Sequence, residues 1–118
     1  MRYDPDRLEL LQGTLEMLIL RTLVFGPLHG QAIGHAIQSR SDGEFLVEHG
    51  SLYPALQRLL AKGWLEAKWG TSDNNRKARF YRLTELGRKH LAAETSKWER
   101  LSAAIARVMN PSHGEQGA

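Results

Sequence analysis

Apolar residues recur at alternating intervals of three and four near the start of the chain, the spacing that places side chains on one face of an α-helix. This stripe begins at Leu8, and the helix is expected to end where Gly26 and Pro27 interrupt it. A second helix is expected over residues 30–38. The next apolar stretch, residues 44–48, is short and rich in strand formers, so it predicts a brief strand.

The middle of the chain predicts one helix followed by two strands. Leucines on one face define a helix over residues 51–62. Ser51 is expected to cap this helix, and Pro54 to lie in its first turn, where a missing backbone N–H costs little. Residues 64–69 and 78–83 then alternate between apolar and polar, which is typical of strands. The residues between them are turn formers that end in cations, so they predict a hairpin loop.

A long final helix completes the predicted fold. Thr84 is expected to cap a helix that continues to Met109, about 39 Å at 1.5 Å per residue. The elements together predict a mainly α protein with a small β-hairpin (α+β), in the arrangement of a winged helix-turn-helix. Residues 1–83 would form the winged helix-turn-helix domain, residues 84–109 a dimerisation helix, and residues 110–118 a disordered tail.

Composition places the chain among globular proteins. Its 118 residues suffice for one hydrophobic core, and 42% hydrophobic with 25% charged residues are ordinary values. The absence of cysteine excludes disulfide frameworks and thiolate metal sites. No apolar run approaches the roughly 20 residues that a membrane span needs, and acidic residues stand near the start, where a signal peptide would be basic. We therefore expect a cytoplasmic domain with no membrane partner.

The net charge of +3 conceals a strong segregation of charge along the chain. Residues 49–90 hold nine lysines and arginines but only three acidic residues, an excess of six positive charges. The remaining residues hold seven bases and ten acids, an excess of three negative charges. A basic section of this kind is typical of a surface that binds a polyanion, although it is also compatible with cations on an inert solvated surface.

The basic section coincides with the predicted third helix and hairpin, which favours double-stranded DNA as the partner. An α-helix fits the major groove, and a basic hairpin can reach the neighbouring phosphates. The candidate DNA-binding residues are Ser51, Tyr53, Pro54, Gln57, Arg58 and Lys62 on the helix, and Arg76, Lys77 and Arg79 on the hairpin. Winged helices also form protein–protein contacts, so a protein-interaction module with an acidic partner is the alternative.

The final helix carries an apolar seam with heptad-like spacing, interrupted at Glu94. A small three-helix core cannot cover a helix of this length, so we expect a homodimer in which it packs on the first helix of a second chain. The candidate dimerisation residues are Leu8, Leu11, Leu15, Leu91, Trp98, Leu101, Ile105 and Val108. The alternative is that the helix folds back within one chain.

No arrangement in the sequence predicts catalysis. The five histidines are scattered, and no two have the spacing of a helical metal site. Ser51 has no neighbouring base to activate it, and the glycines form no phosphate-binding loop. We therefore expect a protein that is not an enzyme and that needs no metal or cofactor.

Several segments resemble the successive motifs of the PadR family of transcriptional regulators, and they occur in the family's order. These segments are Leu15-Glu16-Met17-Leu18-Ile19-Leu20, Gly26-Pro27-Leu28-His29-Gly30, Gly50-Ser51-Leu52-Tyr53-Pro54-Ala55-Leu56, Gly63-Trp64-Leu65 and Arg79-Phe80-Tyr81-Arg82-Leu83-Thr84-Glu85-Leu86-Gly87. The resemblance covers most of the chain, and the length is that of the short class with a single C-terminal helix.

The resemblance implies a dimeric winged-helix repressor that binds a pseudo-palindromic operator and, as in many members, responds to a small molecule. In short members that respond to drugs, a tryptophan from each subunit lines a pore at the dimer interface, and Trp98 is similar in position. A planar aromatic effector would then stack on Trp98, with Leu101 nearby and Glu94 supplying a negative charge for a cationic compound. The other interpretation is that Trp98 fills the dimer core.

Overall fold

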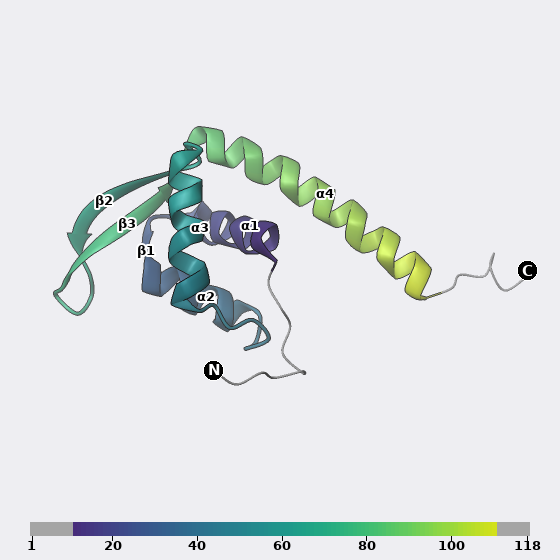
Figure 1. Ribbon diagram of the computed structural model, residues 1–118, viewed down its shortest axis with the longest axis horizontal. Coiled ribbons are helices and arrows are strands. Elements are labelled where there is room, and N and C mark those ends of the chain that lie inside the picture. Colours follow the sequence, from purple (N-terminus) through teal and green to yellow (C-terminus); the bar gives the residue numbers. More distant parts are fainter. Residues whose placement is uncertain (1–10, 111–118) are drawn as a thin grey trace, which may run out of the picture.

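The computed structural model describes residues 11–110, which form a body of three short helices and a small sheet, with a fourth helix extending away from it (Figure 1). Leu8, where the expected first stripe begins, and residues 111–118 lie outside the described residues; the described helix begins at Gln12. The elements are α1 (Gln12–Thr22), the 3-10 turn η1 (Leu23–Phe25), β1 (Leu28–His29), α2 (Gly30–Arg40), α3 (His49–Ala61), β2 (Leu65–Thr71), β3 (Lys77–Leu83) and α4 (Glu85–Met109).

One hydrophobic core lies where the first three helices meet the base of the sheet. Ile19, Ile33 and Leu56 are fully buried there, each from a different helix, and Tyr81 and Leu83 reach the same core from β3. These residues belong to the stripes and alternations that predicted the elements. The predicted α+β winged-helix architecture is therefore confirmed.

Helix α3 begins two residues earlier than the sequence predicts. The carbonyl of Glu48 accepts hydrogen bonds from the N–H groups of Ser51 and Leu52, so the first turn starts at His49. Ser51 lies inside this turn and does not cap the helix, which corrects the expectation above. Pro54 consequently lies in the second turn rather than the first.

The three strands form an antiparallel sheet in the order β1-β3-β2. The hairpin of β2 and β3 pairs from Leu65 opposite Leu83 to Thr71 opposite Lys77, and it projects beyond the core as a wing (Figure 1). The two-residue strand β1, which the sequence analysis did not predict, pairs with Phe80 and Tyr81 of β3.

Residues 44–48 do not form the strand that their composition predicts. Asp42 and Gly43 have positive φ angles of 53° and 78°, which turn the chain directly after α2. The segment then leads into α3 as irregular backbone. Phe45 and Val47 pack against the core, so their apolar character reflects burial beside the helices rather than strand pairing.

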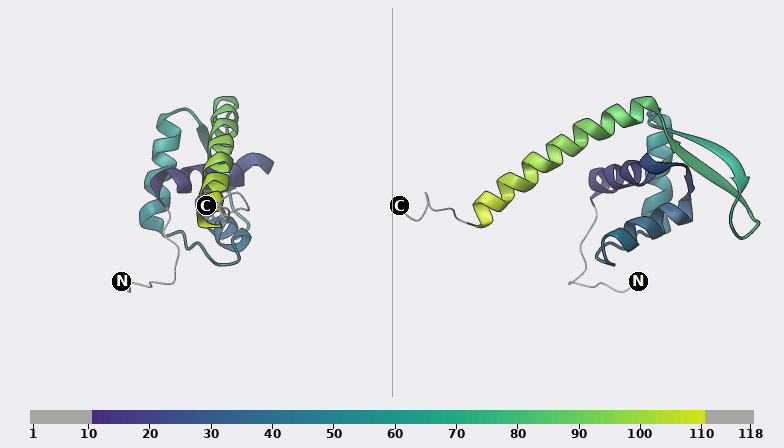
Figure 2. Two further views of the ribbon diagram at one scale, coloured as in Figure 1. Left: turned by 90° about the vertical axis from the view of Figure 1, so that its right-hand side faces the viewer. Right: turned by 180° about the vertical axis from the view of Figure 1, so that it is seen from behind.

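Helix α4 is anchored to the body at its start and projects from it afterwards. Thr84 caps the helix as predicted, since its Oγ1 accepts a hydrogen bond from the N–H of Gly87 at 3.0 Å. The same hydroxyl donates to the carbonyl of Gly63 at 2.7 Å. Leu91 is buried in the core, whereas the later turns leave the body (Figure 2). The start of α4 is therefore part of the packed body.

No helix within residues 11–110 is long and apolar enough to cross a membrane.

Candidate nucleic-acid interface

The outer face of α3 is a narrow ridge of small and polar groups. Ser51, Pro54, Gln57 and Ala61 are exposed, while the leucines on the opposite side of the helix are buried. Because Pro54 has no N–H, the carbonyl of Gly50 lacks the hydrogen bond that a helix normally supplies from that position. The ridge therefore presents the Gly50 carbonyl, free of a bond from position 54, as well as the Gln57 amide, and it is slim enough to enter a DNA major groove.

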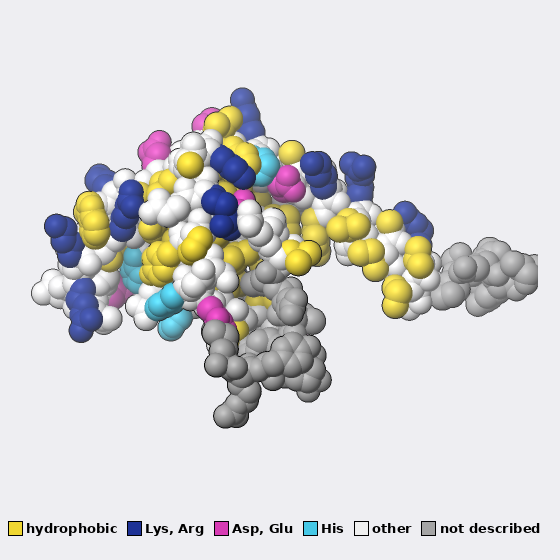
Figure 3. All heavy atoms as spheres, viewed as in Figure 1, with side chains coloured by type: hydrophobic (Ala, Val, Ile, Leu, Met, Phe, Trp, Pro, Cys, Tyr) yellow, Lys and Arg dark blue, Asp and Glu magenta, His cyan; other side chains and the backbone are white. Residues whose placement is uncertain are grey.

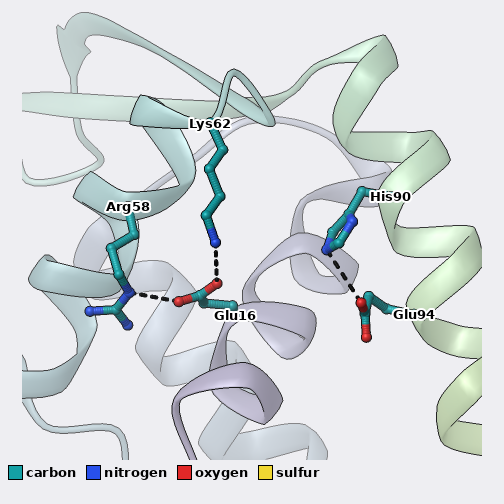
Figure 4. A network of polar contacts seen from close by, with 5 residues as sticks. All are labelled: Glu16, Arg58, Lys62, His90 and Glu94. Carbon is teal, nitrogen blue, oxygen red and sulfur yellow. Dashed lines mark hydrogen bonds and ion pairs between the residues drawn. The ribbon is translucent and has the colours of Figure 1, made fainter.

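Arg58 and Lys62, both expected on this ridge, instead converge on a carboxylate of α1 (Figure 4). The Nε of Arg58 lies 2.6 Å from Oε2 of Glu16, and the Nζ of Lys62 lies 3.7 Å from Oε1. The Glu16 side chain is only 10% exposed, against 32% for Arg58 and 47% for Lys62. The two cations thus compensate a largely buried negative charge, which ties α3 to α1.

The wing carries the exposed cations that the sequence predicts. Arg76, Lys77 and Arg79 are all exposed at or near its tip, and Lys and Arg side chains gather over this part of the molecule in Figure 3. The tip is closed by two backbone hydrogen bonds: the N–H of Ser72 donates to the carbonyl of Arg76 at 2.8 Å, and the N–H of Asn75 to that of Ser72 at 2.9 Å. Asn75 has a φ of 59°, which a tight turn at this place requires.

A groove of about 1010 Å³ separates the wing from α2 and the start of α3. Four cations line it, against one acidic residue, Asp73. The cations are Arg40 at the end of α2 and Arg76, Lys77 and Arg79 of the wing. The polar ridge of α3 therefore lies beside a concave basic surface that continues onto the hairpin, as a polyanion-binding interface requires.

Two tyrosines contribute to this groove in different ways. Tyr53 is 40% exposed and packs closely over the start of α2, where a Cβ on Gly30 would lie only 2.7 Å from the tyrosine hydroxyl. Tyr81 is nearly buried. Burial raises the pKa of the Tyr81 hydroxyl, an effect that the charge of Arg79 opposes and the proximity of Tyr53 reinforces. The Tyr81 hydroxyl is therefore uncharged at neutral pH.

The outer part of α4 presents an apolar face with no covering element in the described chain (Figure 3). Trp98, Leu101, Ile105 and Val108 are between 51% and 77% exposed, and Leu11 before α1 is 71% exposed. The other two described members of the predicted dimerisation set, Leu15 and Leu91, lie in the core of this chain instead. The exposed candidates for a dimer interface are thus Leu11 and the seam from Trp98 onwards.

An aromatic stack joins the body to α4. The rings of Trp64 and His90 are parallel, with centroids 3.5 Å apart, and the Nζ of Lys62 lies 4.8 Å from the centre of the Trp64 ring. On the other side, the Nε2 of His90 lies 3.7 Å from Oε1 of Glu94 (Figure 4). Glu94, expected to be a free negative charge beside Trp98, also lies 3.9 Å from the Nζ of Lys97.

Three residues were absent from the predicted site residues: Glu16 and His90, which make the contacts described above, and Trp69, which lines the groove. Glu16 was detectable as a lone acid beside the apolar stripe of the first helix, since an acid at such a position needs a partner. Trp69 was detectable as a large aromatic at the far end of a strand, beyond the predicted core. The role of His90 depends on a ring from another element, and no local pattern indicates it.

No group of potential metal ligands occurs within residues 11–110.

A polar recognition ridge, a basic groove and a cationic wing on a winged helix-turn-helix body define a DNA-binding transcriptional regulator. The chain matches the family described as the Transcriptional regulator PadR-like family over residues 19–93. Because this match covers more than half of the chain, the protein belongs to the PadR-like family. The members of this family are transcriptional regulators rather than enzymes.

Similar proteins agree with this assignment. An uncharacterized protein of Lysinibacillus sphaericus is 29% identical, over 84% of this chain and 91% of its own length. The crystal structure of a PadR family transcriptional regulator from Eggerthella lenta is 27% identical, with a TM-score of 0.71 over 86% of both chains. A transcriptional regulator from Clostridium thermocellum is 25% identical, with a TM-score of 0.74 over 81% of this chain and 93% of that one.

Proposed function

We propose that this protein is a sequence-specific repressor that binds a pseudo-palindromic DNA operator as a homodimer. One observation carries the proposal: the polar ridge of α3 adjoins a groove lined by four cations and one acid, which leads onto the wing. In this arrangement α3 enters the major groove and reads base edges, while the wing holds the backbone and the adjacent minor groove. Such a protein would act in the cytoplasm, where it meets DNA.

The candidate contacts fall into two groups. Ser51, Gln57 and the Gly50 carbonyl on the ridge are placed to meet base edges, and Arg58 can contribute its two terminal guanidinium nitrogens, because Glu16 engages its Nε. Tyr53 is placed to meet the backbone from the edge of the ridge, and Pro54 sets the shape of the ridge. Lys62, Arg76, Lys77 and Arg79 are candidates for phosphate contacts, which add affinity without sequence information.

The homodimer would form through the exposed seam of α4. Four apolar side chains at least half exposed on one helix are unfavourable in water, and a second copy of the same helix, or Leu11 before α1 of that copy, would cover them. Two-fold symmetry would then present two α3 ridges to successive major grooves, roughly 34 Å apart, which accounts for a pseudo-palindromic operator.

A ligand response would be located on the same helix. Trp98 is half exposed, and a hollow of about 460 Å³ beside Leu101 is lined by Lys97, Arg100 and Arg107. Glu94 is already paired with two cationic or protonatable groups. These charges favour a planar aromatic anion over a cation as the effector. Quenching of tryptophan emission by such anions, and its loss in Trp98→Phe, would support an effector site; unchanged emission favours a role in the dimer core.

The proposal is tested by selecting duplexes that the purified chain binds from a pool of random sequences, followed by fluorescence anisotropy titrations over a range of salt concentrations. We expect enrichment of an inverted repeat, a stoichiometry of two chains per duplex, and affinity that falls steeply with salt. Enrichment of no sequence, with no binding even at low salt, would contradict the proposal. It would favour the alternative of a winged-helix module that binds an acidic protein.

A further inference from the structure

The groove between the wing and α2, which Tyr53 of α3 borders, has the position of one strand of the DNA backbone. In B-form DNA the major groove and the neighbouring minor groove are separated by a single sugar–phosphate strand. If α3 occupies the major groove and the wing the adjacent minor groove, that strand must pass between them. This step rests on the proposed function, and the 1010 Å³ groove, which the wing and α2 line and Tyr53 of α3 borders, offers space for that strand.

Trp69 projects into this groove from the wing. It stands opposite Arg79 in the β2–β3 register, so the two side chains share one face of the hairpin, and Thr71 and Lys77 form the next pair on that face. The Nζ of Lys77 lies 5.3 Å from the centre of the Trp69 ring. Trp69, Lys77 and Arg79 all line the groove, and Tyr53 of α3 borders it on the other side.

The exposure of Trp69 has no structural explanation within the described chain. The side chain is 62% exposed, although it lies on the face of the hairpin that packs on the core further back, at Leu65 and Ala67. Burying a ring of this size is favourable, and cations beside it attract phosphate to the same place. An apolar ring with one cation 5.3 Å from its centre and a second opposite it in the strand register matches the chemistry of a deoxyribose and its phosphates.

We propose that Trp69 is a DNA-contacting residue that packs against a deoxyribose of the strand in the groove, opposite Tyr53. Lys77, beside the ring, and Arg79, opposite Trp69 in the strand register, hold the flanking phosphates. The ring is uncharged, so its contribution to the affinity does not depend on counterion release. It also orders Lys77 through the cation–π contact before DNA arrives.

The test compares the full-length wild-type chain with Trp69→Ala, Trp69→Phe and Phe25→Ala, all titrated with the duplex that wild type selects. We expect Trp69→Ala to weaken binding about tenfold, with little change in the slope of log affinity against log salt. Trp69→Phe retains a ring and should stay within about threefold of wild type. Phe25→Ala is the matched control, because Phe25 is a 78% exposed aromatic that does not line the groove.

A spectroscopic measurement separates contact from an indirect effect. Acrylamide, a neutral quencher, should reach the tryptophans of wild type less readily when DNA is bound, and this protection should disappear in Trp69→Phe, which keeps Trp64 and Trp98. Far-UV circular dichroism and urea unfolding verify that each variant is folded. Equal affinities of wild type and Trp69→Ala, with the same protection in Trp69→Phe, would overturn the assignment of Trp69. Failure of wild type to bind any duplex would instead refute the proposed function itself.

Discussion

The Nε of Arg58 lies 2.6 Å from Oε2 of Glu16, which joins the proposed recognition helix to α1 through a carboxylate that is 10% exposed. The two residues are 42 positions apart in the sequence. A charge-assisted hydrogen bond in such a place orients the guanidinium, and its loss leaves a largely buried charge without its closest partner. Arg58 thus has a structural role whether or not its remaining nitrogens reach DNA.

This pair predicts a measurable coupling energy. Glu16→Ala and Arg58→Ala should each lower the free energy of unfolding by about 1–3 kcal/mol in urea titrations. Lys62→Ala should cost less than about 1 kcal/mol, because its Nζ is 3.7 Å from Glu16 and the side chain is half exposed. A double-mutant cycle should assign at least about 1 kcal/mol to the Glu16–Arg58 interaction. Strictly additive losses would show that the two side chains do not stabilise each other.

The division of the interface into ridge and wing predicts two kinds of DNA-binding defect. Gln57→Ala should reduce discrimination between the selected duplex and a random one by about 1–3 kcal/mol, with an unchanged salt slope. Arg76→Ala should weaken binding to both duplexes and reduce the salt slope by about 1 per subunit. Anisotropy titrations at several salt concentrations measure both quantities. The opposite pattern, specificity lost at Arg76 and salt dependence lost at Gln57, would reverse these assignments.

The exposed seam of α4 predicts a site where one charge prevents dimerisation. Ile105→Glu places a carboxylate among the apolar side chains and should raise the dimer dissociation constant about 100-fold or more. Ala103→Glu is the matched control, since Ala103 is exposed about 160° around the helix from Ile105, at about 100° per residue. Sedimentation velocity over a range of concentrations distinguishes the two. Equal behaviour of both variants would place the interface elsewhere.

The junction between the body and α4 is predicted to be intolerant of a single methyl group. A Cβ at Gly87 would overlap the backbone carbonyl of Trp64, which cannot move aside as a side chain can. Gly87→Ala should therefore lower the free energy of unfolding by about 1–3 kcal/mol. Gly50→Ala, which meets nothing within 4 Å, should change stability by less than about 1 kcal/mol and in the stabilising direction. Thermal unfolding of both variants provides the comparison.

The environment of Tyr81 predicts a loss of stability at alkaline pH. Burial raises the pKa of its hydroxyl above the ordinary value of 10.0, so above that pH the unfolded chain loses this proton more readily than the folded one. The stability that this pKa difference contributes to the free energy of unfolding is fully present below pH 10, and it is lost as the pH rises through the pKa of the folded state. Tyr81→Phe should remove this part of the pH dependence of the unfolding free energy. A variant curve parallel to that of wild type would show that Tyr81 does not cause it.

Local patterns in the sequence were sufficient to predict the helices, the wing and their charges. Apolar residues recur every three or four positions through Ile19, Ile33 and Leu56, and every second position in the hairpin. This spacing predicts both the type of element and its buried face, because both are set within the element itself. The same holds for the cap at Thr84 and for the cations of the wing. The strand predicted at residues 44–48 failed because a short apolar stretch does not distinguish pairing from packing.

Which elements form, and where the positive charge is concentrated, can be predicted from local patterns, since both depend on neighbours in the chain. The packing of separate elements is what holds Arg58 against Glu16, stacks His90 on Trp64 and leaves Trp69 exposed over a basic groove. It also buries Leu15 and Leu91 in the core while Trp98 stays exposed. These relationships depend on how separate helices cross and on strand register, which bring together residues that no local period connects.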